Sequence, residues 1–303
     1  MPNNHAPSVV VLMSVFNGSR YLREQIDSIL SQVRVKVILQ VWDDGSTDDT
    51  REILDSYGED LTYWTGENHG AAQGFLQAVG LCNATAPYYA FSDADDVWLP
   101  TKLIDAITEL EDHKILGPAL IATKMTLTDS DLNPIGETAQ PTIPFSFENA
   151  LVQGAIGGAS CVINSDLWQI FKSQRPTTLV MHDGWLYLVA TAFGQIIFSS
   201  KSGILYRQHN SNVMGARHGI KARWVRRLKW IASKGDKQKD QAREFLRLFG
   251  DRLSLQQRRT AEIFAFHDRS PGSRIRFAIA PPVIFNSARS RALYTLRAAL
   301  ART

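Results

Sequence analysis

The sequence predicts an α/β fold in which helices flank a mostly parallel sheet, followed by a basic and mainly helical carboxyl-terminal region. Two observations lead to this prediction: apolar runs rich in β-branched residues alternate with helical patterns, and the net charge changes sign along the chain. With 303 residues, of which 44% are hydrophobic and 21% charged, the chain can form a domain of about 200 residues and a further region.

Strands and helices alternate through the first part of the chain. Apolar runs predict strands at 9–15, 35–42, 61–66 and 88–93, and helical patterns follow at 21–32, 47–57, 71–82 and 99–113. In such a sheet, ligands bind beyond the carboxyl ends of the strands. The polar segments NGSR, DDGSTDDT, GENHGAAQG and SDADD, one after each strand, are therefore expected on one edge. They contain neither the glycine-rich dinucleotide fingerprint nor a P-loop.

The charge distribution divides the chain into two predicted domains. Residues 1–216 carry 12 Lys and Arg against 24 Asp and Glu, whereas residues 217–303 carry 21 against 6. A basic region of this kind suits an anionic partner, either a membrane surface or a nucleic acid. Because the sequence has no RNP, zinc-finger or helix-turn-helix signature, we expect no nucleic acid as a partner.

The cysteines and the apolar runs indicate the compartment. Cys82 and Cys161 lie among apolar or small residues, which predicts core cysteines and a reducing compartment. The run from Val9 to Met13 follows no basic residue, so it favours a first strand over a signal peptide. No run approaches the roughly 18 apolar residues that span a membrane. We therefore expect a cytoplasmic protein.

Three carboxylates, Asp93, Asp95 and Asp96, lie within four residues at the end of the fourth predicted strand. They repel one another unless a cation neutralises them, and Mg²⁺ or Mn²⁺ with oxygen ligands is the usual solution. In the alternative interpretation, Asp96 caps the helix that begins near Leu99 and Asp93 is a solvated turn residue. The stretch by itself leaves both open.

The DADD stretch is one of several segments that resemble, in the same order along the chain, segments of family 2 glycosyltransferases with the GT-A fold. The resemblance runs from about residue 8 to residue 215 and rests on SVFNGSRYLREQIDSILSQ, VWDDGSTDDT, NHGAAQGFLQA, SDADDVWLPTKL, GGASCVINSDLW, HDGWLYL and YRQHNSNVMG. It implies a metal-dependent enzyme that takes a sugar from a nucleotide diphosphate donor and transfers it with inversion.

The resemblance also implies roles for the matched residues on the donor side. Asp93 and Asp95 form the family's DxD pair, Asp95 is the principal metal ligand, and Asp96 and His209 join the ligand set. Asp44 contacts the nucleobase and Asp43 supports its turn, while Arg207 is an alternative diphosphate ligand. Taken singly, DDGSTDD also suits a helix cap and His209 a turn residue. The implied donor site comprises Phe16, Asn17, Asp43, Asp44, Asn68, Gly70, Gly74, Asp93, Ala94 and Arg207.

The HDGW segment is implied to carry the catalytic base. Asp183 would deprotonate the acceptor hydroxyl as it attacks, with His182 orienting this carboxylate or tuning its pKa. Many relatives have Glu in place of His182, and rhamnosyltransferases often have an aromatic residue in place of Gly184, which leaves the acceptor pocket open. The alternative is that Asp183 caps the helix predicted at 184–193.

The donor implied by the resemblance is dTDP-L-rhamnose, and the acceptor is a hydroxyl of a growing cell-surface polysaccharide, with a lipid carrier. Family 2 enzymes change nucleotide and sugar with few substitutions, so a UDP-hexose donor is the alternative. A non-catalytic sugar-nucleotide-binding relative is a further alternative, which retention of Asp93, Asp95 and Asp183 disfavours.

Two amphipathic stretches give the basic region its own interpretation. Apolar residues recur at helical spacing in 220–231 and again at Leu293, Leu296 and Leu300, with Lys and Arg around them. Trp and Arg on such helices suit an anionic bilayer surface, which predicts peripheral association with the cytoplasmic membrane. The alternative is that the stripes pack on the catalytic domain or on another subunit of a homo-oligomer.

Overall fold

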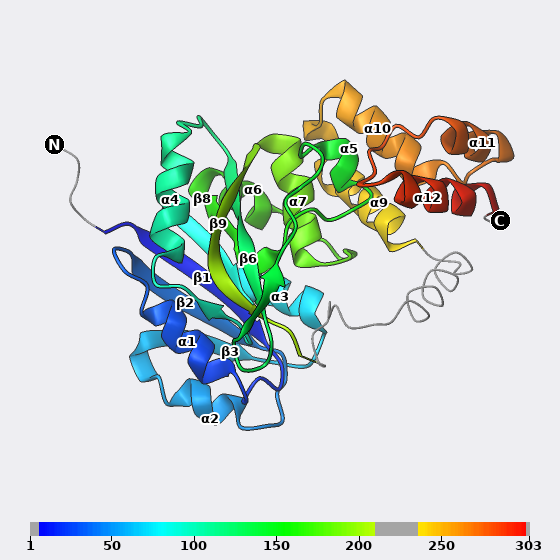
Figure 1. The fold of residues 1–303 in the computed structure, drawn as a ribbon. Coiled ribbons are helices and arrows are strands. Elements are labelled where there is room, and N and C mark those ends of the chain that lie inside the picture. The colour runs from blue at the N-terminus through cyan, green and yellow to red at the C-terminus, as the bar shows by residue number, and fades with distance from the viewer. Residues whose placement is uncertain (1–5, 210–235, 301–303) are drawn as a thin grey trace.

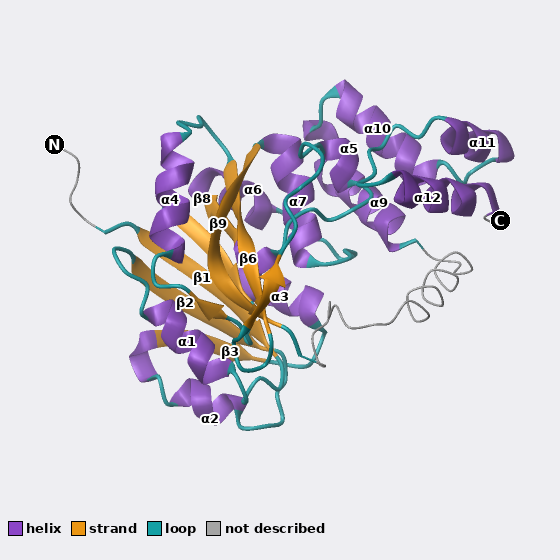
Figure 2. Cartoon of the chain, viewed as in Figure 1, coloured by secondary structure: helices purple, strands orange, loops and turns teal. Residues whose placement is uncertain are grey.

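The computed structural model describes residues 6–209 and 236–300. One sheet forms the centre, helices cover both of its faces, and the carboxyl-terminal helices lie together beyond one end (Figures 1 and 2). The strands are β1 Ser8–Val15, β2 Lys36–Asp43, β3 Leu61–Thr65, β4 Tyr88–Ser92, β5 Val97–Trp98, β6 Ala119–Thr128, β7 Pro134–Glu137, β8 Cys161–Asn164 and β9 Gln195–Arg207. Their order is β3-β2-β1-β4-β8-β6-β9-β5, with β7 paired to β6.

The helices follow the strands in chain order. In the first domain they are α1 Leu22–Leu30, α2 Thr50–Asp55, α3 Ala71–Leu81, α4 Lys102–Asp112, α5 Phe147–Ala150, α6 Ser165–Ser173 and α7 His182–Phe193. The carboxyl-terminal region contributes α9 Lys237–Phe249, α10 Leu255–Phe266, α11 Pro271–Ile279 and α12 Ala288–Leu300. Short 3-10 turns occur at Gly58–Asp60, Gly158–Ser160 and Gly250–Arg252.

The predicted α/β fold is confirmed, and the four predicted strand–helix units are all present. Strands β3, β2, β1 and β4 pair in parallel, as the alternation predicted. The later strands add a second parallel pair, β6 with β9, and antiparallel pairings through β8 and β5 that the sequence did not predict. Strands β5 and β8 have two and four residues, too few for an apolar period to be recognised.

The sheet is buried on both faces. Along β1, Val10 and Leu12 join one apolar cluster while Val9, Val11 and Met13 join the other, because successive side chains point to opposite faces. Cys82 and Cys161 are both buried and are not joined in a disulfide, as predicted for core cysteines. Burial on both faces explains why the strands read as continuous apolar runs.

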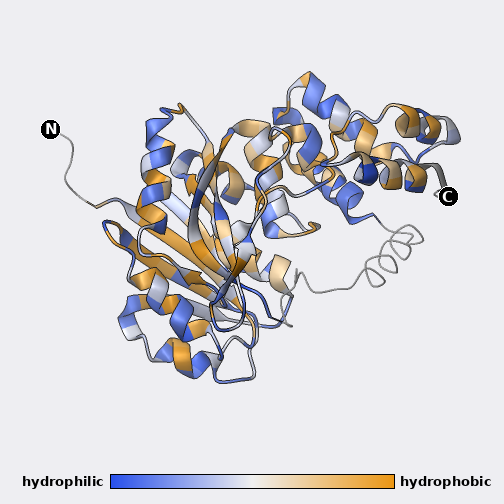
Figure 3. Cartoon of the chain, in the orientation of Figure 1, coloured by the Kyte–Doolittle hydropathy of each residue, from blue (hydrophilic) through white to orange (hydrophobic). Residues whose placement is uncertain are grey.

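The basic region shares the core of the first domain instead of forming one of its own. Phe245 of α9 stacks edge-on against Trp185 of α7, with 5.3 Å between ring centroids, and Phe249 packs beside it. Val180 donates a backbone hydrogen bond to Gln241 on the same helix. All three aromatic residues belong to one buried apolar cluster, and Figure 3 shows the hydropathy of each residue along the helices. The predicted domain boundary at 216 and the predicted helix at 220–231 lie outside the described residues.

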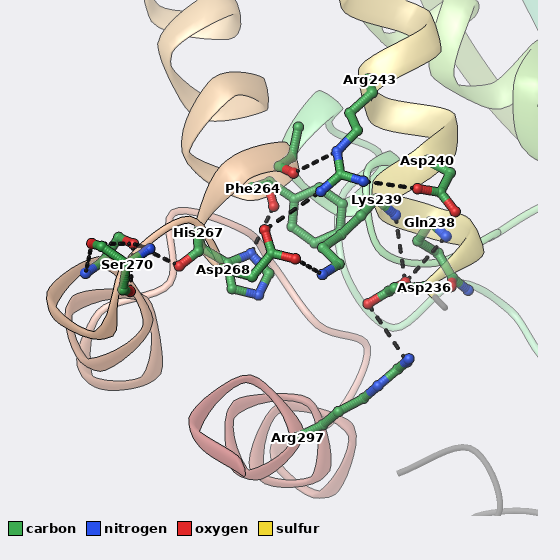
Figure 4. A network of polar contacts seen from close by, with 12 residues as sticks. Asp236, Gln238, Lys239, Asp240, Arg243, Phe264, His267, Asp268, Ser270 and Arg297 are labelled. Atoms are coloured by element: carbon green, nitrogen blue, oxygen red, sulfur yellow. Dashed lines mark hydrogen bonds and ion pairs between the residues drawn. The ribbon is translucent and has the colours of Figure 1, made fainter. Parts of the chain in front are cut away.

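A polar network joins the carboxyl-terminal helices to one another (Figure 4). Asp236 caps α9 by accepting hydrogen bonds from the backbone amides of Gln238 and Lys239. The same carboxylate accepts a 2.6 Å hydrogen bond from the Tyr294 hydroxyl and pairs with Arg297, both on α12. Lys239 pairs with Asp268 after α10. The start of α9 is thereby tied to the last two turns of α12.

The inward face of α12 differs from the predicted stripe of Leu293, Leu296 and Leu300. Tyr294, Arg297 and Ala298 are buried, whereas Leu296 is exposed. Tyr294 and Arg297 turn inward because the buried carboxylate of Asp236 requires donors, a constraint that apolar periodicity does not register.

Glu244 of α9 should stabilise the contact between the two regions in a pH-dependent way. Hydrogen bonds from Arg247, followed by those from the Thr177 amide and hydroxyl, lower the pKa of Glu244 from 4.5 to about 2. Stability from this carboxylate is present above about pH 4.5 and is lost as pH falls through about 2. We expect Glu244→Gln to lower the free energy of unfolding by roughly 2 kcal/mol at pH 7.

Urea unfolding of wild type and variant between pH 7 and pH 2.5 measures this effect. The difference between them should shrink below pH 4.5, and a difference that stays constant would contradict the assignment. Glu262→Gln is the matched control, because Glu262 pairs with Arg258 at the surface. Loss of a surface pair costs between about 0 and 1 kcal/mol.

Candidate active site

The loops after β1 and β2 are locked together at the carboxyl edge of the sheet. The Asn17 amide donates to the Ser46 hydroxyl at 2.9 Å, and the Asn17 side-chain oxygen accepts from the Thr47 amide at 2.8 Å. Asn17 has a φ of +49°, a left-handed conformation that Asn tolerates better than most residues. Phe16 beside it is half exposed. The predicted convergence of the first two polar segments is thus observed.

Asp43 and Asp44 are both buried, and each has a separate structural task. Asp43 accepts hydrogen bonds from the Ser46 amide, Arg51 and Thr65. Burial raises the pKa of Asp43, but these hydrogen bonds outweigh burial and hold the pKa below its usual value. The carboxylate of Asp43 therefore stays ionised at neutral pH and can accept these hydrogen bonds, which hold the turn together. This gives a physical basis for the predicted role of Asp43 in supporting the turn.

Asp44 connects the second polar segment to the third. Its carboxylate accepts from the Trp42 indole at 3.0 Å and from the backbone amides of His69 and Gly70. Asn68 reinforces the turn by accepting from the Gly70 amide, and Gly70 adopts a φ of +81°. The predicted nucleobase contact stays a prediction; in this structure the carboxylate is engaged by its own chain.

Gly74 allows α3 to approach this edge closely. A Cβ at Gly74 would lie 2.4 Å from the Ser14 hydroxyl and 3.5 Å from the Asp44 carboxyl carbon. Any larger side chain would therefore push α3 away from the ends of β1 and β2. The predicted donor-site residues of the third segment are thus held against those of the second.

The DADD stretch lies between β4 and β5. Burial, followed by the charges of Asp95 and Asp183, raises the pKa of Asp93 to about 7. Burial, followed by the charges of Asp93 and Asp95, also raises the pKa of Asp96 well above its usual range. Ala94 packs against the second apolar cluster. The structure therefore brings Asp93, Asp95, Asp96 and Asp183 into one electrostatically coupled site.

Neither alternative for these aspartates describes the structure. Thr101, not Asp96, is the N-cap of α4, and Asp96 is buried and accepts from the Arg207 amide at 3.0 Å. Asp93 is partly buried within the carboxylate cluster and so is not a freely solvated turn residue. The N-cap of α7 is Met181, so Asp183 is not that helix's cap either.

Arg207, the last residue of β9, braces the aspartate loop. Its guanidinium is buried and donates to the Asp95 carbonyl at 2.9 Å, to the Ser130 carbonyl and to the Glu24 carboxylate at 2.6 Å. The guanidinium carbon also lies 4.4 Å from the centroid of the Tyr21 ring. These contacts differ from the predicted diphosphate contact, because the guanidinium is occupied by acceptors of its own chain.

His209 and Asp95 are the predicted metal ligands that the structure brings into contact. The His209 Nε2 lies 2.9 Å from Asp95 Oδ2, and the Tyr21 ring packs against the imidazole. Within residues 6–209 and 236–300, no three His, Cys, Asp or Glu side chains are arranged to hold a metal ion. Of the four predicted ligands, Asp96 is buried and accepts a hydrogen bond from the Arg207 amide.

The Asp95–His209 pair nevertheless fits a hard divalent ion. Mg²⁺ is commonly bound through one or two carboxylates and completed by water and substrate phosphates, so three protein ligands are not required. Asp95 and His209 supply an oxygen and a nitrogen donor, and their side chains are 30% and 13% exposed. The pair is therefore reachable from solvent, unlike Asp96.

Asp183 and His182 begin α7 but face different surroundings. The Asp183 carboxylate is partly exposed and accepts from the Gly184 amide. The His182 ring is buried and stacks on Phe75 with 3.6 Å between centroids, and burial lowers its pKa to about 4. Neither His182 nitrogen has a hydrogen-bond partner within the described part of the chain. The imidazole is thus neutral, and its contribution here is packing.

Gly158 shapes the same corner of the site. A Cβ at Gly158 would lie 2.4 Å from His182 Nε2 and 3.4 Å from the Asp183 Cβ. The GGAS segment therefore passes directly beside the predicted base. The sequence resemblance included this segment but did not single out Gly158.

Three further residues of the site were missed from the sequence. Tyr21 packs against both Arg207 and His209, and Glu24 pairs with Arg207, although neither lies in a predicted loop. Lys102 is buried with its Nζ 3.7 Å from the Trp98 ring centroid, and burial lowers its pKa to about 7. A lysine in the first turn of a helix opposes the helix dipole, a signal that sequence reasoning did not use.

No described helix is long and apolar enough to cross a membrane.

The family model for glycosyl transferase family 2 matches residues 10–168, which include the first three polar segments and the DADD stretch.

Curated relatives match at moderate identity. A dTDP-rhamnosyl transferase of Shigella flexneri is 28% identical over 72% of this chain and 80% of its own length. A putative teichuronic acid biosynthesis glycosyltransferase of Bacillus subtilis is 28% identical over 63% of this chain and 75% of its own length. An uncharacterized glycosyltransferase of Rickettsia typhi is 32% identical over 38% of this chain, but the match spans only 36% of that relative.

Solved structures share the fold over nearly the whole chain. TarS residues 1–349 from S. aureus, in complex with UDP-GlcNAc, superposes with a TM-score of 0.56 at 15% identity, covering 96% of this chain and 89% of that one. A Pyrobaculum calidifontis mannosyltransferase in complex with GDP-Man and Mn²⁺ gives 0.50 at 19% identity, covering 99% and 84%. Because the family model covers half of its residues, and the fold agrees, this chain belongs to glycosyl transferase family 2.

Proposed function

We propose that this chain is a metal-dependent inverting glycosyltransferase that moves a sugar from a nucleotide diphosphate donor to a saccharide hydroxyl. The observation that carries the proposal is that the charges of Asp95 and Asp183 both raise the pKa of Asp93. Asp93 and Asp95 follow β4, whereas Asp183 begins α7, so their convergence gathers both predicted chemical roles at one edge of the sheet.

Asp183 serves as the base in this proposal. It takes the proton of the acceptor hydroxyl while that oxygen attacks the anomeric carbon, and the nucleoside diphosphate leaves from the opposite face with the bonding electrons. Configuration inverts because the new and the broken bond lie on opposite faces. The partial exposure of Asp183 supports this role, since an acceptor must reach it from solvent.

Asp95 and His209 would hold the divalent ion, together with phosphate oxygens of the donor. When bound, Mg²⁺ or Mn²⁺ supplies the positive charge that stabilises the leaving diphosphate. Arg207 and Tyr21 keep the Asp95 loop and His209 in position for that task. The pKa values of Asp93 and Asp96 are raised because their ionised forms are disfavoured here, and a bound cation would favour those ionised forms.

The favoured donor is dTDP-L-rhamnose, and the favoured acceptor is a growing cell-surface polysaccharide on a lipid carrier. The relative from Shigella flexneri, named a dTDP-rhamnosyl transferase, supports the sugar. The basic carboxyl-terminal region supports peripheral association with the cytoplasmic side of the inner membrane, where a lipid-linked acceptor is available. A UDP-hexose donor remains the second candidate, favoured by the UDP-GlcNAc complex of TarS.

Nucleotide titrations test the donor assignment directly. We expect calorimetry with dTDP, UDP and GDP to show preferential dTDP binding that strengthens when Mn²⁺ is added. Preference for UDP would discard rhamnose and keep the enzyme class. Failure to bind any of the three would contradict the proposed activity itself.

Asp183→Asn should abolish sugar transfer and leave donor binding nearly unchanged, because the base acts only as the acceptor attacks. We expect transfer to fall by roughly 10²- to 10⁴-fold in a radiolabelled-sugar assay. Asp166→Asn is the matched control, since Asp166 is an exposed first-turn carboxylate on α6. An equal loss of dTDP affinity in Asp183→Asn would show that this residue contributes to donor binding instead.

Asp95→Ala should remove the metal dependence of donor binding. The affinity for dTDP in the presence of Mn²⁺ should fall roughly tenfold or more, while the affinity without metal changes little. Asp105→Ala, which removes an exposed carboxylate from α4, should behave as wild type. Full Mn²⁺ stimulation in Asp95→Ala would rule out Asp95 as the principal ligand.

A further inference from the structure

The α11–α12 pair presents apolar side chains to solvent on the side opposite its packed face. Ile275 and Ile279 of α11 are 60% and 73% exposed, and Leu296 of α12 is 48% exposed. Isolated exposed apolar residues are ordinary, but these occur one turn apart on α11 and again on the helix packed against it.

Helical geometry shows why these side chains point outward. Phe277 of α11 and Tyr294 of α12 are buried, and both rings pack against Phe264 of α10. Residues two positions away lie about 200° around a helix, which puts Ile275 and Ile279 opposite Phe277. The same reasoning puts the exposed Ala292 and Leu296 opposite Tyr294. We call Ile275, Ile279, Ala292 and Leu296 the outer face; the exposed Arg276 and Arg291 lie on the sides of the two helices, about 100° from Phe277 and about 60° from Tyr294.

The charge of this part of the chain differs from that of the helices before it. In α9, α10 and their connections, basic side chains pair with acidic ones, as Lys239 does with Asp268 and Arg258 with Glu262. Residues 269–303 contain seven arginines and no Asp, Glu or Lys. Arg297 turns inward to Asp236, while Arg276 and Arg291 are exposed beside the apolar residues.

We propose that the outer face of the α11–α12 pair docks on an anionic phospholipid bilayer. Exposed isoleucine and leucine side chains enter the boundary between headgroups and acyl chains, and the arginines contact the lipid phosphates. A second copy that met this surface with the same surface would bring arginines against arginines and be repelled, whereas an anionic bilayer complements them. Nucleic acid complements the charge but offers no apolar region for Ile275 and Ile279. The inference rests on the proposed membrane location and specifies the surface responsible for it.

The position of the outer face indicates that the protein would contact the membrane at the end that lies away from the candidate active site. The α11–α12 pair lies beyond α9 and α10, away from the sheet and its polar edge (Figure 1). Docking there leaves the loops after β1, β2 and β4 uncovered, so donor binding is expected to be independent of the bilayer.

The test compares full-length protein with the double variant Ile275→Asp/Ile279→Asp in vesicle sedimentation. Phosphatidylcholine vesicles with and without added phosphatidylglycerol are the probes. We expect wild type to sediment only with phosphatidylglycerol and the double variant to bind at least roughly tenfold more weakly. Arg276→Gln/Arg291→Gln should weaken binding by a factor of roughly five for each arginine, an effect that added salt removes.

Leu116→Asp and Leu255→Asp are matched controls, because these leucines are 95% and 89% exposed but lie outside the face. Both should sediment as wild type does. Far-UV circular dichroism and dTDP titration establish that each variant is folded. Point variants are preferred to truncation, since removing the region would also remove Phe245 and Phe249 from the core.

Three results would overturn the inference. If the double variant bound vesicles as well as wild type does, the outer face would not be the membrane-binding surface. If wild type did not bind phosphatidylglycerol vesicles, the protein would have no surface that docks on an anionic bilayer. The wild type could instead form concentration-dependent dimers or bind oligonucleotides, bind no vesicles, and lose that association in the double variant. The outer face would then bind a second copy of the chain or a nucleic acid, and the inference would be wrong. Intact dTDP binding without vesicle binding refutes docking alone, whereas vesicle binding without nucleotide binding refutes the proposed activity alone.

Discussion

The site depends on the buried guanidinium and backbone of Arg207. Three carboxylates crowded after one strand repel one another, and Arg207 offsets that repulsion through its charge and through hydrogen bonds to Asp96 and to the Asp95 carbonyl. Because Arg207 ends β9, the conformation of the aspartate loop is set by a strand that lies far along the chain. The ion pair with Glu24 extends the same support to α1.

The carboxylates occupy two kinds of environment, and this division gives the site its chemistry. Asp43, Asp44 and Asp96 are buried and accept hydrogen bonds from their own chain, so they maintain the architecture of the loops. Asp95 and Asp183 are partly exposed, and therefore can meet a cation, a donor or an acceptor. Within the DADD stretch, burial thus separates Asp96, which supports the loop, from Asp95, which a ligand can reach.

The carboxyl-terminal region combines two opposite surfaces. Its inner side is aromatic and joins the core of the first domain through Phe245, Phe249 and Trp185. Its ion pairs concentrate on α9 and α10, which leaves the α11–α12 pair with arginines and exposed aliphatic side chains. The sequence already separates the two parts of this region by charge, and the packing decides which side chains join the core and which face solvent.

The sequence by itself determined the strand–helix alternation, the parallel order of the first units and the gathering of four polar loops at one edge. These features follow from periods of two and 3.6 residues and from the geometry of parallel sheets, both of which are local. It also pointed to Asp93, Asp95 and Asp183. Only the tertiary structure decided that Arg207 meets Glu24, 183 residues away, that Asp96 turns inward, and that α12 buries Tyr294 instead of Leu296. Such contacts depend on which buried polar groups require partners once distant elements pack, and no local pattern encodes that requirement.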